Sequence, residues 1–343
     1  MKKAIIIILI FNVLRLIILP FVNILPNESF FFTGNNTSVF LKLAAIPFNN
    51  GLLGISSFIV NKNIIFVRVV CFLLSLISQW ALYLLISKII RTDRKYFSWV
   101  VMVSIFSITY TAITSLTNTL LLLFWVLSIL TLYNAVFQGD KKSWAISGIF
   151  MGMALLNKLS GLALPAGLFL FLIFSSRYRK YLFTPWPYIT LLLTMVFSLP
   201  MLMGMYKSSS VLIQTSQIEA VSHLFNISIN QYTGFVGFQI ILIFPILYIG
   251  LWWVTFKYFG RIFKKPNQVN SELWFLFAFF IPLFTGFHLI SIFGHVDFFG
   301  LIPIYIPGMI VLLKLIKKPW MAWSFGFSII SHLWLVFGLL FSG

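Results

Sequence analysis

The sequence predicts an all-α integral membrane protein, a polytopic helical bundle of about eleven spans. Two features of the composition support this. Apolar residues make up 60% of the 343 positions and charged residues only 9%, and the mean hydropathy is +1.02. A soluble domain of this composition would have too little polar surface to face water. A third feature is that the apolar residues fall in runs of about 20, the length of one helical crossing, and a helix satisfies its own backbone in lipid.

The whole chain, 1–343, is expected to form one transmembrane domain without a separate soluble part. Two longer segments, 23–63 and 206–234, are expected to be loops on the outer face. The first has apolar residues at helical spacing, which favours short helices lying in the outer interface. The expected spans cover roughly residues 4–22, 64–89, 97–115, 117–137, 144–157, 160–175, 185–205, 235–256, 272–292, 300–314 and 320–341.

The basic residues indicate the orientation of the bundle. The formal net charge is +18, and most Lys and Arg lie in short clusters after alternate spans. Such an asymmetry marks the cytoplasmic side, so the N-terminus is expected in the cytoplasm and the opposite face outside. This arrangement excludes nucleic acid as the reason for the charge. The first span is expected to be a retained signal anchor, and the single cysteine, Cys71, allows no intrachain disulfide.

The six acidic residues are few enough for their positions to be informative. Asp93 and Asp140 fall in basic turns and are interpreted as solvated structural residues. Glu272 opens a span and complements the helix dipole there. The remaining three, Glu28, Glu219 and Asp297, are expected on the outer face.

Several basic groups accompany those acids on the outer face. Lys158, Arg68 and His295 are expected there, and ionisable groups beside a membrane are costly unless they are paired or functional. We therefore expect a polar site at the outer ends of several helices. A structural interpretation stays open for each group: Lys158 and Arg68 as snorkelling side chains, Glu28 as a solvated loop charge, and His295 with Asp297 as a simple pair.

Other polar residues have no place in that site. Arg15 lies in the middle of the first span and requires a polar partner or a cavity, and His288 is interpreted as a satisfied helix residue. No spacing typical of a zinc site, a phosphate-binding glycine loop or a nucleophile elbow occurs in the chain. No cofactor is therefore predicted, and the need for a divalent metal stays open.

A series of short motifs, each weak alone, runs along the chain in a characteristic order. They are Asn27-Glu28 after the first span, Phe48-Asn49-Asn50, Val67-Arg68 at the start of the second span, Thr117-Asn118 before a Leu-rich run, the segment 148–165 with Asn157-Lys158, and Gly294-His295-Val296-Asp297. In this order the chain resembles the GT-C type polytopic glycosyltransferases, specifically bacterial relatives of the dolichyl-phosphate-mannose protein mannosyltransferases and of the lipid A aminoarabinose transferase. The sequence departs from the family pattern where Asn27, Asn49 and Asn118 stand in place of Asp.

The resemblance implies transfer of a sugar from a polyprenyl-phosphate donor to a lipid or protein acceptor on the outer face of the membrane. It implies that Lys158 and Arg68 bind the donor phosphate. The catalytic positions would be Glu28, as general base, with Asn27 and Asp297. The further site candidates are Asn49, Asn50, Asn118 and His295.

The lost carboxylates leave the activity open, because Asn cannot accept a proton as a general base. They favour a lipid or phosphate acceptor, which arrives ionised, over a Ser or Thr hydroxyl. The alternatives are a catalytically inactive relative that binds lipid or glycan, a flippase for a lipid-linked glycan, and a polymerase or ligase of surface polysaccharide. The expected location is a bacterial inner membrane with the active face in the periplasm and undecaprenyl phosphate as carrier.

Overall fold

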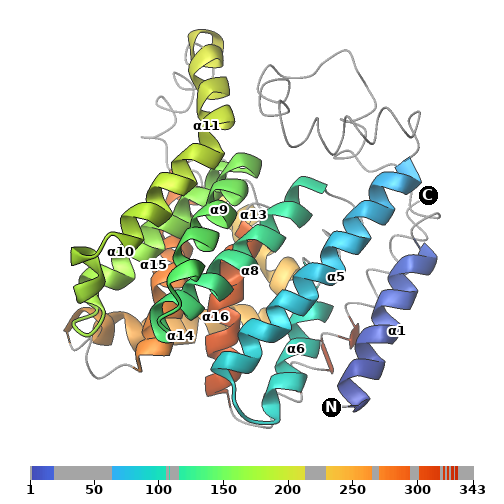
Figure 1. The fold of residues 1–343 in the computed structure, drawn as a ribbon. Coiled ribbons are helices and arrows are strands. Elements are labelled where there is room, and N and C mark those ends of the chain that lie inside the picture. The colour runs from blue at the N-terminus through green and yellow to red at the C-terminus, as the bar shows by residue number, and fades with distance from the viewer. Residues whose placement is uncertain are drawn as a thin grey trace.

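Helices make up almost all of the regular structure in the described part of this computed structural model, and no strand occurs there (Figure 1). The predicted all-α fold is therefore confirmed. The structure describes residues 2–18, 64–105, 108, 116–212, 229–264, 270–293, 301–316, 320, 323, 326–327 and 329–330.

The helices follow the apolar runs closely. Their bounds are α1 Lys2–Ile18, α5 Ile64–Ile89, α6 Arg94–Ser104, α8 Leu116–Phe137, α9 Lys141–Asn157, α10 Ala163–Phe174, α11 Trp186–Leu212, α13 Ile229–Ile243, α14 Pro245–Lys264, α15 Ser271–Phe293 and α16 Ile302–Leu315, with the 3₁₀ turns η1 Leu159–Leu162 and η2 Arg179–Phe183.

Three of these helices are long and apolar enough to cross a membrane by themselves, over Arg68–Ile89, Asn118–Phe137 and Ser271–Ile292. Shorter apolar helices cover Leu159–Phe174, Trp186–Met201 and Ile302–Leu315. The expected number of about eleven spans stays a prediction.

Helix α9 lies between α8 and α11 and packs extensively against both. Two glycines one turn apart explain the close contact with α11. A Cβ at Gly148 would lie 2.5 Å from the Thr190 carbonyl oxygen, and one at Gly152 would lie 2.6 Å from Phe197 Cβ. Thr190 Oγ1 also donates to the Trp144 carbonyl at 2.8 Å. Small residues four apart that let two backbones approach, with hydroxyl donors across the contact, are typical of helix pairs in membranes.

The region predicted as one span over 235–256 is not one continuous helix but a bent pair of helices. Helices α13 and α14 meet at an angle of 113°. Phe244, between them, has φ 79°. The residue before a proline is sterically disfavoured in the helical region, so the helix ends ahead of Pro245, which then begins α14 at a position where its missing N–H costs nothing.

The two predicted outer loops lie largely outside the described residues. No residue of 23–63 is among the described residues, which resume at Ile64. Helix α11 continues to Leu212 and α13 begins at Ile229, so helices extend into both ends of the segment 206–234.

Arg15 finds the polar surroundings that its position in the first span requires. It is fully buried, and its guanidinium donates to the Val103 carbonyl at 2.6 Å and to Asn12 Oδ1 at 3.4 Å. Asn12 and Gln79 exchange two amide hydrogen bonds at 3.0 and 3.1 Å. Val103 is in the last turn of α6, where carbonyls lack a partner within the helix. Arg15 therefore joins α1 to the end of α6.

His288 is likewise a satisfied helix residue, as predicted. Its Nδ1 lies 2.7 Å from the Phe284 carbonyl, which can only accept, so Nδ1 carries the proton. Nε2 then accepts from the Tyr248 hydroxyl at 2.7 Å.

Candidate functional site

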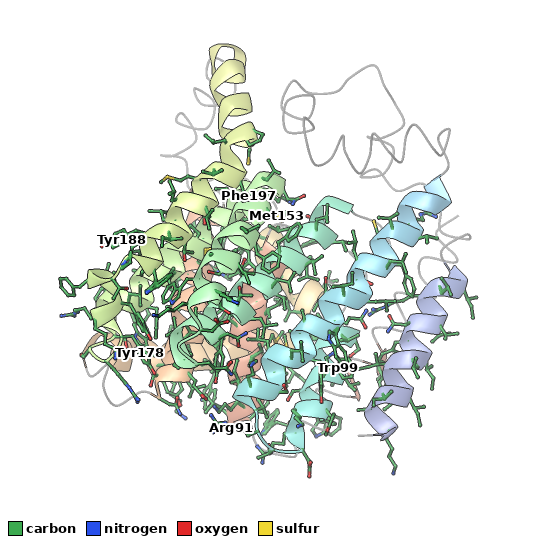
Figure 2. The ribbon with its side chains drawn as sticks, in the orientation of Figure 1. Arg91, Trp99, Met153, Tyr178, Tyr188 and Phe197 are labelled. Carbon is green, nitrogen blue, oxygen red and sulfur yellow. The ribbon has the colours of Figure 1, made fainter. Side chains whose placement is uncertain are left out.

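The described helices have two ends with different chemistry. Arg91 lies at the lower end of the bundle in Figure 2, whereas Met153 and Phe197 lie towards the upper end. We call the end that holds Arg91 the basic face, because Arg94, Arg177 and Lys314 line one cavity together with Arg91. The end at which α5 and α8 begin and α9 ends is called the opposite face (Figure 1).

Asn118 and Lys158 come together on the opposite face. Asn118 lies in the first turn of α8 and is 8% exposed. Lys158 follows the last residue of α9 and is half-buried. Its Nζ donates to Asn118 Oδ1 at 3.3 Å. Because α8 and α9 are consecutive antiparallel helices, the beginning of one meets the end of the other, which brings these residues together across 40 positions of sequence.

The turn after α9 fixes the position of Lys158. Its backbone is extended, with φ −161° and ψ 142°, and its N–H donates to the Ala154 carbonyl at 3.2 Å. The chain then folds back in η1, where Gly161 packs against the last turn of α9. A Cβ at Gly161 would lie 2.5 Å from the Leu155 nitrogen and 2.6 Å from its Cα. Real Cβ contacts essentially never approach this closely, so this turn requires glycine.

The adjacent Asn157 does not share the role that its place in the motif suggests. Its Nδ2 donates to the Met153 carbonyl of its own helix at 2.7 Å. This bond satisfies a carbonyl in the last turn of α9, so Asn157 helps to end the helix.

Arg68 is the third described candidate. It lies near the start of α5 and is 1% exposed. Helix α5 packs along α8, and both begin at the opposite face (Figure 1). An arginine buried to this degree is costly unless polar groups surround it. Its burial also argues against a side chain that snorkels to the membrane surface.

The remaining predicted site residues lie outside the described part of the chain. They are Asn27, Glu28, Asn49, Asn50, His295 and Asp297. Among the described residues no group of three His, Cys, Asp or Glu could hold a metal ion.

Two acidic turn residues behave as local structure. The Asp140 carboxylate accepts from the Lys142 backbone N–H at 3.1 Å and from Ser143 Oγ at 2.6 Å, and so caps α9. The hydroxyl of Ser143 lowers the pKa of the Asp140 carboxyl below its usual value. Asp93 precedes α6 without a side-chain cap.

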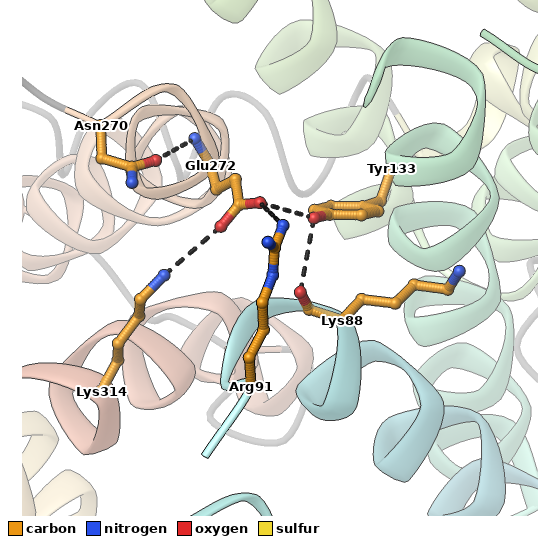
Figure 3. Close-up of polar contacts among 6 residues, drawn as sticks. All are labelled: Lys88, Arg91, Tyr133, Asn270, Glu272 and Lys314. Carbon is orange, nitrogen blue, oxygen red and sulfur yellow. Dashed lines mark hydrogen bonds and ion pairs between the residues drawn. The ribbon is translucent and has the colours of Figure 1, made fainter. Parts of the chain in front are cut away.

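Glu272 has a larger role than sequence reasoning gave it. It lies in the first turn of α15, as predicted for a residue that complements the dipole. The carboxylate also pairs with Arg91 at 3.2 Å and Lys314 at 3.4 Å. It accepts from the Tyr133 hydroxyl at 2.8 Å (Figure 3). The sequence offered only the alternation of basic clusters as a signal for this convergence, because its members are up to 181 positions apart.

Part of the chain is similar to a known protein family. Residues 47–203 match the family model described as dolichyl-phosphate-mannose-protein mannosyltransferase. The resemblance is confirmed. No curated protein and no solved structure matches the chain significantly. With its apolar helices, this glycosyltransferase-like chain is an integral membrane protein.

The matched segment covers some predicted site residues and not others. It contains Arg68, Asn118 and Lys158, together with Asn49 and Asn50. The remaining candidates, Asn27, Glu28, His295 and Asp297, lie outside it. The match therefore includes Lys158 and Arg68, the expected phosphate-binding residues, but not Glu28, the expected general base.

Proposed function

We propose that this protein transfers a sugar from a polyprenyl-phosphate donor to a lipid or protein acceptor at the opposite face. The single observation that carries the proposal is the contact between Lys158 Nζ and Asn118 Oδ1, inside the family-matched segment. This contact helps to orient the Lys158 ammonium group. A positioned cation is what a phosphate leaving group needs as its negative charge develops.

The reaction requires one bond to break and one to form. The bond between the anomeric carbon and the phosphate oxygen breaks, and both electrons leave with the polyprenyl phosphate. An acceptor oxygen forms the new bond to the anomeric carbon. Lys158 and Arg68 bind the leaving phosphate, each through charge-assisted hydrogen bonds.

The proton of the acceptor depends on the acceptor's chemistry. A hydroxyl acceptor gives its proton to a base, for which Glu28 is the candidate and Asp297 the second. A phosphate acceptor arrives ionised and needs none. The asparagines at 27, 49 and 118 favour the second case. The opposite face is then the periplasmic side of a bacterial inner membrane, and the basic face, with the N-terminus, is cytoplasmic.

The test compares cell-envelope glycolipids and glycoproteins by mass spectrometry, with and without the gene. Complementation uses wild type, Lys158→Ala and Glu28→Gln, with Lys142→Ala on α9's other end as the matched control. We expect one glycan modification to disappear with the gene, to return with wild type and Lys142→Ala, and to fall roughly 100-fold with Lys158→Ala, as for loss of one preorganised donor.

The other outcomes discriminate between the alternatives. Full restoration by Lys158→Ala removes Lys158 from the site. A glycan profile unchanged by loss of the gene, combined with binding of the polyprenyl-phosphate sugar to the purified protein, identifies a lipid-binding relative without turnover. Loss with Lys158→Ala but not with Glu28→Gln favours an ionised acceptor.

A further inference from the structure

A cavity opens at the basic face, far from the proposed donor site. Its volume is about 670 Å³. Six segments meet around it: the ends of α5, α8 and α16, the turn before α6, the turn after α10 and the start of α15.

The lining carries four basic side chains and one carboxylate, a net formal charge of +3. Glu272 holds two of the cations, since Oε1 accepts from Arg91 at 3.2 Å and Oε2 from Lys314 at 3.4 Å (Figure 3). The carboxylate is 18% exposed and Lys314 is 26% exposed. Arg91 is 77% exposed, so its ion pair contributes little stability, and its position suits contact with a ligand.

The other two cations have neutral partners. Arg94 donates to the Ile316 carbonyl at 3.4 Å, and the Arg177 guanidinium lies 5.7 Å from the centre of the Tyr178 ring. These contacts orient the side chains but leave their charges in place. The start of α15, at Ser271, adds the positive end of a helix dipole. Gathering like charges around one cavity costs energy, and a bound anion removes that cost.

Part of the remaining wall is apolar and comes from Ile89, Ile90 and Phe137, and the rest of it is polar. A cavity for a freely soluble ion gains nothing from them, whereas an amphiphile buries apolar surface there. Basic pockets between membrane helices on the cytoplasmic side are known to suit phosphate head groups of lipids. We propose that this cavity binds the phosphodiester head group of an anionic membrane lipid, held by Arg94 and Arg177.

Binding is measured on the full-length purified protein by native mass spectrometry. The probes are dioleoyl phosphatidylglycerol, dioleoyl phosphatidylcholine and inorganic phosphate. We expect phosphatidylglycerol to bind in preference to the other two. The double variant Arg94→Gln/Arg177→Gln is expected to bind it about 30-fold more weakly, roughly fivefold for each charge. The control Lys142→Gln/Lys180→Gln removes the same charge from α9 and η2, outside the cavity, and should bind as wild type does.

A second variant tests the proposal in case the double variant does not fold. Ser271→Glu places a carboxylate in the first turn of α15, where acidic residues stabilise a helix, and lowers the charge of the cavity. It should melt at or above the wild-type temperature and bind phosphatidylglycerol about fivefold more weakly.

Three results overturn the proposal. They are equal binding of phosphatidylcholine and phosphatidylglycerol, equal weakening by the control pair, and unchanged binding by Ser271→Glu. Inorganic phosphate that displaces the lipid at equal concentration overturns the lipid as the source of the phosphate group. None of these measurements depends on sugar transfer.

Discussion

Replacing Gly161 with alanine tests whether the turn after α9 positions Lys158. The added Cβ would lie 2.5 Å from the Leu155 nitrogen, against at least 3.4 Å in an ordinary contact. The Leu155 nitrogen belongs to the backbone, so no side chain can rotate to make room. The turn must move away from α9 by about 0.9 Å, and Lys158 lies within that turn.

Two effects of different size follow from this displacement. Overpacking of this kind costs about 1–3 kcal/mol of stability, which thermal unfolding followed by tryptophan fluorescence detects. A displacement of about 1 Å in a positioning group lowers a reaction rate by as much as 100-fold. We therefore expect Gly161→Ala to lower sugar transfer by roughly tenfold to 100-fold while the protein still folds.

The matched control is Gly286→Ala in α15, because a Cβ at that position meets nothing within 4 Å among the described residues. It should leave transfer unchanged. The decisive comparison is Gly161→Ala combined with Lys158→Ala. If Gly161 acts through Lys158, the double variant transfers sugar no more slowly than Lys158→Ala alone. Rate losses that multiply, or a Gly161→Ala protein with wild-type transfer, would refute the reasoning.

Two further predictions concern α9. Gly148→Ala should lower stability by about 1–3 kcal/mol, since its Cβ would meet the Thr190 carbonyl oxygen at 2.5 Å; a melting temperature equal to that of Gly286→Ala would contradict the packing described for α9 and α11. Asp140→Ala should lower the melting temperature by removing the cap of α9, whereas Asp140→Asn should retain most of it, because Asn caps helices about as well. The Asp140 pKa is lowered on folding, so the carboxylate stabilises fully above its unfolded pKa of about 3.9. This stabilisation is lost as pH falls through the lower folded pKa. The prediction is wrong if the difference in melting temperature between wild type and Asp140→Asn does not shrink on acidification.

The sequence alone predicted features that depend on local chemistry. Apolar runs determined the all-α fold and most helix bounds, because a backbone in lipid must satisfy itself within the helix. The place of Glu272 in the first turn of α15 was predicted in the same way, from its neighbours in sequence. The family resemblance also came from motif order, and it drew attention to Lys158 and Asn118.

Hydropathy alone could not predict the helix break within the expected span over 235–256. Its apolar residues are continuous on both sides of Phe244, and hydropathy does not register backbone geometry. The sequence did hold the relevant signal, a proline at 245, but prolines also occur within α11, α15 and α16 without such a break. Only the tertiary arrangement distinguished these cases.

Partners distant in sequence were decided by the tertiary structure alone. Lys158 meets Asn118 because α8 and α9 form an antiparallel pair. Arg15 reaches Val103 across 88 positions, and Arg91 reaches Glu272 across 181. Composition and spacing say which residues need a partner, since a charge beside lipid is costly alone. Which partner each one finds depends on how the helices pack, and that is a property of the whole bundle.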